Sequence, residues 1–139
     1  MGPMGVARAV KSQFIRSSDD VRHLPLRGGT VTQVRISATY VDLILELESG
    51  GSAQIRLESR ATVSADRDSL TLDAGPALGV AVAQLMDRRV AKIDVDGMDL
   101  VLVFEGDHTL TAHVEKSGYE SYQVTWSGET WTAIQDFEA

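Results

Sequence analysis

The feature that most constrains the fold is a segment that occurs twice in the chain. Residues 42–48 (DLILELE) align without a gap onto residues 99–105 (DLVLVFE), and Leu or Phe recurs at every second position of both. Side chains of a β-strand alternate between its two faces, so each segment predicts a strand with one buried face. Continuing in register, the alignment matches Ala53, Ile55, Leu57 and Glu58 with Leu110, Ala112, Val114 and Glu115. Gly50-Gly51 falls on Asp107-His108, so a turn meets a turn.

The strand that precedes each copy has a counterpart as well. Val31, Val34 and Ile36 correspond to Val90, Ile93 and Val95, with the second loop shorter by two residues. The sequence therefore predicts two similar three-stranded meanders, over about 30–58 and 89–115. Pairing the apolar faces of the two meanders would close one hydrophobic core.

The segment between the two meanders predicts a short strand and then a helix. Pro76 suits the first turn of a helix, where its missing N–H would have no partner in any case. The residues after it form an apolar stripe of Leu78, Ala81, Val82, Leu85 and Met86. We therefore expect one central helix over about 76–87, packed on the sheet.

The two ends of the chain extend this plan. Residues 122–126 and 130–134 flank a turn that contains Gly128, which predicts a C-terminal hairpin. Residues 1–23 predict an N-terminal arm with a short amphipathic helix, because Val6, Val10, Phe14 and Ile15 have near-helical spacing. The arm's SSDD segment at 17–20 predicts a helix end or a loop. The expected fold class is α+β, mainly antiparallel β, in a single domain over 24–139.

Composition narrows the setting and the partners. The length of 139 residues suits one domain, and the chain has no cysteine, which excludes a disulfide, a thiolate metal site and a cysteine nucleophile. No apolar stretch approaches the ~20 residues of a membrane helix, so we expect a cytoplasmic protein that does not bind membranes. The net charge of −7 repels phosphate, so nucleic-acid binding is not expected.

Signatures of catalysis or metal binding are weak. His108 and His113 are five residues apart on one predicted strand, so they should point to opposite faces and not share a metal. Residues 94–99 (DVDGMD) resemble part of a calcium loop but lack its full spacing, and Asp96-Gly97 predicts a tight turn instead. The chain has no Gly-x-Ser-x-Gly elbow and no phosphate loop. We expect no cofactor and no metal, and the balance favours a protein that is not an enzyme.

Six residues are candidates for binding a partner protein. Four are C-terminal aromatics, which either belong to the core or form a recognition patch: Tyr119, Tyr122, Trp126 and Trp131. The other two are Val101 and Val103, which make the second meander apolar on both faces. Either the helix at 76–87 covers that second face, which we favour, or another protein does.

Three segments together resemble a family of small uncharacterised actinobacterial proteins, mycobacterial ones included. They are residues 24–31 (LPLRGGTV), the repeated Leu-x-Leu strand with its glycine turn, and residues 119–124 (YESYQV) with Trp131. The resemblance covers about residues 24–135 and implies no activity and no site residues, because the family has none assigned. In size and acidity the chain also resembles immunity proteins of bacterial toxin systems.

Three hypotheses about function follow. The first is a non-catalytic protein-binding domain with a regulatory or immunity-like role in an actinobacterium. The alternative is a small-molecule-binding protein, or a hydrolase, with a pocket between the two β units. The third is a purely structural oligomer, such as a homodimer, that uses the face of Val101 and Val103.

Overall fold

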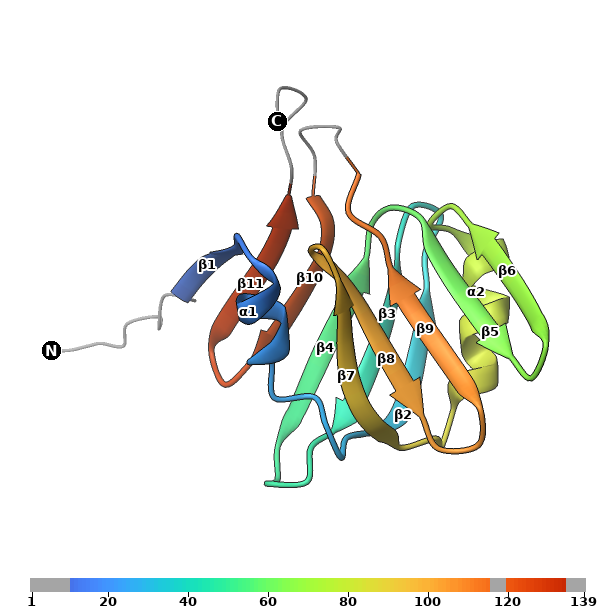
Figure 1. The fold of residues 1–139 in the computed structure, drawn as a ribbon, viewed down its shortest axis with the longest axis horizontal. Helices are drawn as coiled ribbons and strands as arrows, with labels where there is room; N and C mark the ends of the chain where they lie inside the picture. The colour runs from blue at the N-terminus through green and yellow to red at the C-terminus, as the bar shows by residue number, and fades with distance from the viewer. Residues whose placement is uncertain (1–10, 116–119, 135–139) are drawn as a thin grey trace, which may run out of the picture.

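The computed structural model describes residues 11–115 and 120–134, and it is mostly β-strand (Figure 1). Its helices are α1 (Ser18–Arg22) and α2 (Pro76–Val82), and α2 continues into the 3-10 turn η1 (Ala83–Leu85). Its strands are β1 (Lys11–Ile15), β2 (Thr30–Ile36), β3 (Val41–Glu46), β4 (Ser52–Leu57), β5 (Ala61–Ala65), β6 (Asp68–Leu72), β7 (Val90–Asp96), β8 (Asp99–Phe104), β9 (His108–Ala112), β10 (Glu120–Trp126) and β11 (Glu129–Ile134). The predicted class, α+β with mainly antiparallel strands, is confirmed, although the central helix is small.

The strands form two sheets that lie face to face, one in front of the other in Figure 1. Sheet A has the order β1-β11-β10-β4-β3-β2, and sheet B has the order β6-β5-β9-β8-β7. Neighbouring strands are antiparallel except for β1, which runs parallel to β11. Each meander supplies three strands to one sheet, so the duplicated sequence produces the two layers of a sandwich.

The alignment of the two copies is confirmed for their second and third strands. Leu43 pairs with Ile55 in the first meander, and Leu100 pairs with Ala112 in the second, as the alignment requires. The predicted match of the first strands is wrong by two residues, because Leu43 pairs with Val34 whereas Leu100 pairs with Val95. A shift of two residues keeps the same side chains on the inner face, so apolar spacing alone did not reveal it.

The two inner faces form one hydrophobic core, as expected. Leu43, Leu45, Leu100 and Leu102 are at most 1% exposed and belong to a single cluster of buried side chains. The sheets are also joined at one end, where residues 28–31 and 87–90 exchange backbone hydrogen bonds. Gly28 and Val31 donate their N–H groups across this seam, and those of Asp87 and Val90 are donated back.

The helix α2 closes one side of the sandwich and does not lie on its outer surface. It contacts β2 and β3 of sheet A together with β5 and β6 of sheet B (Figure 1). Its buried residues are Leu78, Gly79, Ala81 and Val82, and the side chain of Ile36 occupies the space that a Cβ on Gly79 would need. The expectation that this helix covers Val101 and Val103 is therefore wrong, because those two valines point out of sheet B.

The N-terminal segment differs from its prediction. Residues 11–15, which include Phe14 and Ile15, form a strand beside β11, and the predicted helix positions Val6 and Val10 lie outside the described residues. The SSDD segment begins a helix and does not end one, because the Ser17 side chain caps the N–H of Asp20. Strand β1 lies at the edge of sheet A and buries one of its faces: Ile15 is 2% exposed, whereas Phe14 on the other face is 50% exposed.

The C-terminal hairpin is confirmed and is continuous with the first meander. Trp126 pairs with Glu129 across a two-residue turn, where Ser127 and Gly128 both have positive φ. Strand β10 pairs with β4, so the hairpin extends sheet A beyond the edge of sheet B. Among the described residues, no helix is long and apolar enough to cross a membrane.

Candidate functional site

The outer face of sheet B is a regular array of small side chains. Cross-strand pairing aligns two rows over four strands: Thr71, Thr62, Thr111 and Val101 in one, and Ser69, Ser64, Thr109 and Val103 in the other. The side chains that β5 and β6 supply to each row are hydrogen-bonded, with 2.7 Å between the hydroxyls of Thr62 and Thr71 and 3.2 Å between those of Ser64 and Ser69. At one end of this array lies a histidine.

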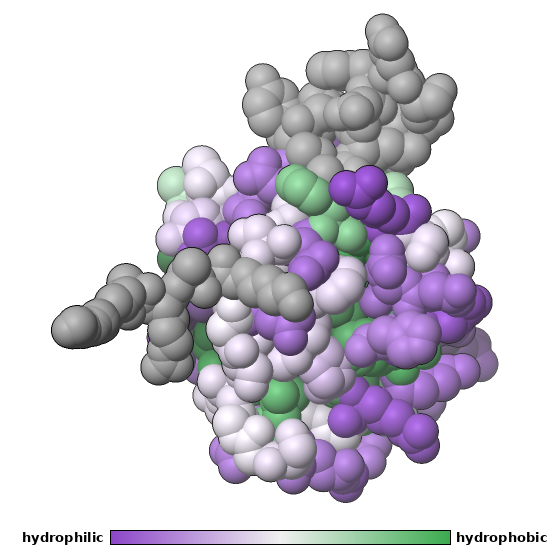
Figure 2. All heavy atoms as spheres, turned by 90° about the vertical axis from the view of Figure 1, so that its left-hand side faces the viewer, coloured by the Kyte–Doolittle hydropathy of each residue, from purple (hydrophilic) through white to green (hydrophobic). Residues whose placement is uncertain are grey.

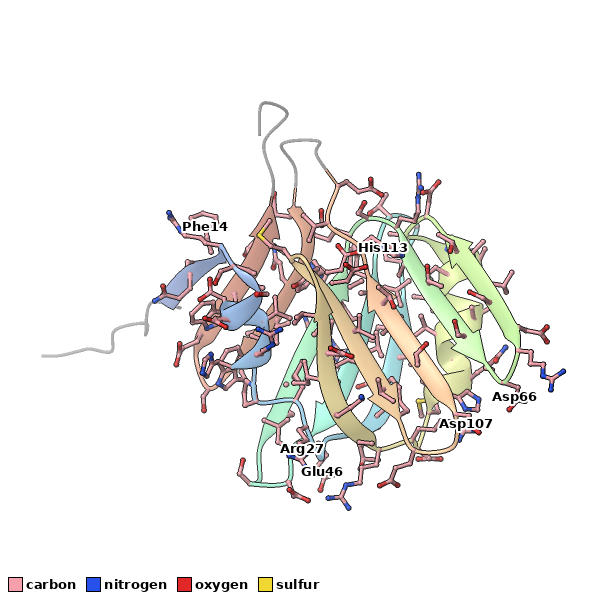
Figure 3. All side chains as sticks on the ribbon, in the orientation of Figure 1. Phe14, Arg27, Glu46, Asp66, Asp107 and His113 are labelled. Carbon is pink, nitrogen blue, oxygen red and sulfur yellow. The ribbon has the colours of Figure 1, made fainter. Side chains whose placement is uncertain are left out.

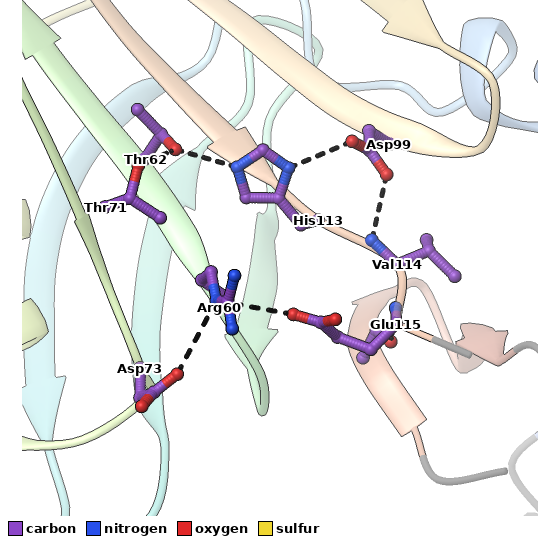
Figure 4. Close-up of polar contacts among 9 residues, drawn as sticks. Arg60, Thr62, Thr71, Asp73, Asp99, His113, Val114 and Glu115 are labelled. Carbon is purple, nitrogen blue, oxygen red and sulfur yellow. Dashed lines mark hydrogen bonds and ion pairs between the residues drawn. The ribbon is translucent and has the colours of Figure 1, made fainter. Parts of the chain in front are cut away.

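His113 connects the array to a carboxylate. Its Nδ1 atom lies 3.0 Å from Oδ2 of Asp99, and its Nε2 atom lies 2.7 Å from Oγ1 of Thr62 (Figure 4). The second oxygen of Asp99 accepts the backbone N–H of Val114 at 2.8 Å. Both carboxylate oxygens are thus engaged, and the ring is held from both sides. This is the geometry in which a carboxylate orients an imidazole toward a hydroxyl.

A shallow depression of about 380 Å³ opens onto this cluster. Its lining includes Thr62, Thr71, Asp99 and His113. Arg60 reaches the same depression, and its Nε atom lies 3.6 Å from Glu115 and 3.7 Å from Asp73. These two ion pairs are long and exposed, so they hold the guanidinium group weakly.

The first meander carries a different pair at the equivalent position. The alignment that places Asp42 on Asp99 also places Arg56 on His113. Arg56 donates two hydrogen bonds to Asp42, at 2.8 and 3.0 Å, and its guanidinium lies 3.9 Å from the ring centre of Tyr40. These bonds to Asp42 raise the pKa of Arg56, while burial acts in the opposite direction. The first pair is a bidentate ion pair, whereas the second contains a side chain that can accept a proton.

A second surface lies along α2, and we name it the α2 edge. It consists of the exposed residues of α2 and η1, of Met86 directly after η1, and of two exposed apolar residues on neighbouring strands: Pro76, Ala77, Val80, Ala83, Gln84, Met86, Ile36 and Leu70. The exposed fractions are 67% for Val80, 54% for Leu70 and 49% for Ile36. A small hollow of about 200 Å³ separates Leu70 on β6 from Ala81 and Gln84.

The pocket expected between the two β units corresponds to two adjoining hollows at the seam. The larger has a volume of about 520 Å³ and is lined by Arg27, Gly28, Glu48 and Arg89 among others. An ion pair between Arg89 and Glu48 joins the two units there. Figure 3 shows Arg27 and Glu46 at this end of the sandwich and His113 toward the opposite end, so the seam and the histidine cluster are separate sites.

The residues predicted to bind a partner do not form one patch. Tyr122 is fully buried, and its hydroxyl donates to the carbonyl of Met98 at 2.9 Å, so its assignment to a binding surface is wrong. Burial raises the pKa of this phenol, as expected for a group that stays protonated. Trp126 and Trp131 are half-buried and stacked, with ring centres 6.3 Å apart on the core-facing side of the hairpin. Tyr119 lies outside the described residues.

Val101 and Val103 are half-buried within the two rows of the outer face of sheet B. Their role in binding stays a prediction, as does that of the two tryptophans. Figure 2 looks onto the side of the molecule at β1 and α1, where hydrophobic residues appear as separate areas among hydrophilic ones. That side has no continuous apolar surface in view.

His108 and His113, which were not expected to share a metal, have separate hydrogen-bond partners. His108 bonds through Nδ1 to the carbonyl of Gly106 in its own turn, whereas His113 bonds to Asp99 and Thr62. Sequence reasoning missed the cluster, because it considered histidine only as a metal ligand. The alignment of the two copies contained the signal: it places Asp42 on Asp99 and Arg56 on His113, so the aspartate is the same in both copies while its partner differs.

Among the described residues, no three His, Cys, Asp or Glu side chains are grouped so that they could hold a metal ion. A tight turn is present in place of a calcium loop, one residue later than predicted: Asp96 ends β7 and pairs with Asp99, so Gly97 and Met98 form the two-residue turn. Comparisons with protein-family models, with curated proteins and with solved structures found no match to this chain, so the resemblance to an actinobacterial family stays a prediction.

Proposed function

We propose that the chain is a protein-binding domain with a regulatory or immunity-like role in the cytoplasm of an actinobacterium. The α2 edge is the surface that contacts the partner. The observation that carries this proposal is the combination of exposed apolar side chains with a local lack of charge at that edge.

The lack of charge is specific to this part of the chain. Residues 69–86, which contain α2, η1 and all of β6 except Asp68, include one charged residue, Asp73, although 24% of the whole chain is charged. Depletion of charged residues at the centre of a contact area is typical of protein interfaces. A helix that only closed the side of a sandwich would gain solubility from charged residues on its outer face, as surface helices usually do.

The strand at this edge adds a second way to bind. Strand β6 is the last strand of sheet B, so one row of its backbone groups faces away from the sheet (Figure 1). Exposed edge strands are commonly protected by charged residues, and β6 carries only Asp68, at its first position. An extended segment of a partner can pair with such an edge and place apolar side chains on Leu70.

The charges around the α2 edge indicate which residues the partner should carry beside its apolar segment. Carboxylates flank the α2 edge at Asp68, Asp73 and Asp87, and the chain has a net charge of −7. A partner that offers an apolar segment bordered by basic residues would complement both features. A second copy of this acidic chain would meet like charges at the same border.

The proposal is tested by site-specific photo-crosslinking of the full chain in its native cell. Benzoylphenylalanine replaces Val80 on the α2 edge or, as a matched control, Lys92, an exposed residue of β7 at the opposite edge of sheet B. We expect one discrete adduct with a different protein from position 80 and none from position 92. No adduct at position 80, the same adducts at both positions, or an adduct of twice the chain mass would each contradict the proposal.

The small-molecule alternative is favoured by one observation, the polar hollow at the seam. Arg89 and Glu48 from the two β units line it together with Arg27. A ligand of this hollow should raise the melting temperature of the wild type and not that of Arg89→Ala. A screen in which every stabilising ligand acts equally on both proteins would exclude this alternative.

A further inference from the structure

We propose that Thr62, His113 and Asp99 form a nucleophilic site that accepts an acyl group from an ester onto Oγ1 of Thr62. This activity is independent of the α2 edge, because the three residues lie on the outer face of sheet B. The proposal rests on their distances, on the proton arrangement that these distances impose, and on a comparison with the first meander.

With His113 neutral, the hydrogen bonds admit one arrangement of protons. A carboxylate only accepts, so the short contact between Asp99 and Nδ1 places the ring proton of a neutral His113 on Nδ1. Nε2 is then the acceptor, and the hydroxyl of Thr62 donates to it at 2.7 Å. Since Thr62 has used its single proton, the contact of 2.7 Å with Thr71 is one in which Thr71 donates.

The supporting contacts hold this arrangement in place. The N–H of Val114 fixes Asp99 through the oxygen that does not face the ring. Thr71 holds the hydroxyl of Thr62 from the side opposite His113. Asp99 and Thr71 therefore act as positioning residues. Nucleophile, base and orienting carboxylate are all within the 2.6–3.2 Å that such sites show.

The site is open to an ester and contains a positive charge. The depression of about 380 Å³ exposes Thr62 and His113 and is lined by Arg60 as well. The ion pairs of Arg60, at 3.6 and 3.7 Å, are longer than normal hydrogen bonds. Its guanidinium group can therefore turn toward the negative oxygen that forms when a carbonyl is attacked.

The first meander provides an internal comparison. Arg56 at the equivalent position holds Asp42 in a bidentate pair and is always charged, so it cannot take a proton from a hydroxyl. The duplicated framework thus keeps an aspartate in both copies and places a proton acceptor beside a hydroxyl in the second copy. An arginine such as Arg56 already stabilises the aspartate at this position. We therefore infer that His113 has a role other than stabilising Asp99.

The reaction balances without a cofactor. Oγ1 of Thr62 bonds to the carbonyl carbon of the ester while its proton passes to Nε2 of His113. The bond between that carbon and the leaving oxygen then breaks, and the proton on Nε2 goes to the leaving alcohol. Water, losing a proton to Nε2, attacks the acyl-threonine, and the proton returns to Oγ1 as the carboxylic acid departs.

The test uses the full chain with p-nitrophenyl acetate. Release of nitrophenol reports acylation, and peptide mass mapping reports an acetyl group on Thr62. The variants are Thr62→Val and His113→Gln, with Thr111→Val as the matched control, because Thr111 pairs with Thr62 on the neighbouring strand and lies outside the hydrogen-bonded chain. Melting temperatures confirm that each variant is folded.

We expect acetylation of Thr62 in the wild type and in Thr111→Val, and a loss of about a hundredfold or more in rate in the other two variants. Asp99→Asn should shift the pH profile of the rate, a change that a purely structural role would not produce. An unlabelled Thr62 in the wild type, or a rate that Thr62→Val leaves unchanged, would overturn the proposal.

Discussion

His113 faces Asp99 with 3.0 Å between Nδ1 and Oδ2, at the position where the first meander pairs Arg56 with Asp42. The duplicated chain has kept the acid and changed its partner. Because the two copies share strand register over this region, each pair serves as a control for the other. Four further predictions follow from the core, from the first pair and from two groups with raised pKa values.

The two meanders should contribute equally to the core. Leu45 and Leu102 occupy equivalent positions and are both 0% exposed. Replacing either by Ala should lower the free energy of unfolding by about 2–5 kcal/mol, because each change removes buried methyl groups and leaves a cavity. Urea titration measures this loss. A change below about 1 kcal/mol in either variant would contradict the placement of that strand.

Arg56→Met should lower the free energy of unfolding by more than is usual for a side chain that is 31% exposed. Asp42 is 2% exposed, so removing its partner leaves a buried carboxylate without compensation. We expect a loss of about 3–5 kcal/mol in the free energy of unfolding, measured in urea. The double variant Asp42→Leu/Arg56→Met is the control and should recover much of the loss, since no buried charge remains. Equal losses in both variants would show that packing by the arginine, and not charge, dominates.

Glu58 should make stability depend on pH. Burial of its carboxyl raises the pKa, Glu120 raises it further, and Arg56 lowers it. A raised pKa means that the folded chain binds this proton more tightly, so the contribution to stability is complete below the usual pKa of 4.5 and is lost as the pH rises through the folded value.

Glu58→Gln should therefore be more stable than the wild type at pH 7, and this advantage should disappear below pH 4.5. Thermal unfolding at a series of pH values measures the difference. Glu46→Gln, which removes the same charge from an exposed side chain, separates the effect from the change in net charge. An advantage that persists unchanged in acid would argue against burial as its cause.

Tyr122→Phe should destabilise the link between the hairpin and the second meander. The phenol donates to the carbonyl of Met98, in the turn between β7 and β8, and is fully buried. Losing a single buried hydrogen bond should lower the free energy of unfolding by about 1–3 kcal/mol. Chemical denaturation followed by tryptophan fluorescence gives this value. A neutral effect would mean that water replaces the hydroxyl.

The sequence predicted the elements that depend on local periodicity and on the repeat. The strands around Leu45 and Leu102, the tight turn that contains Gly97 and the C-terminal hairpin all follow from two-residue alternation and from the positions of glycines. The helix near Pro76 was also correct in position, although it ends in a 3-10 turn at Leu85.

The errors arose where tertiary packing decides. The spacing of Phe14 and Ile15 suits a helix as well as a strand, and pairing with β11 selected the strand. Periodicity shows that the central helix has an apolar stripe but not which surface that stripe covers. Leu100 pairs with Ala112, so the hairpin of β8 and β9 brings Asp99 beside His113. No spacing in the sequence encodes the meeting of His113 with Thr62, which lies on β5.

Binding of a partner protein by the α2 edge should be visible in the backbone amides of β6 and α2. Its most direct test is hydrogen–deuterium exchange of the chain, alone and with the protein captured from position 80. We expect slower exchange in β6 and α2 when the partner is bound, with β7 unchanged as the internal reference. Exchange that slows at β7, or nowhere, would contradict binding at the α2 edge.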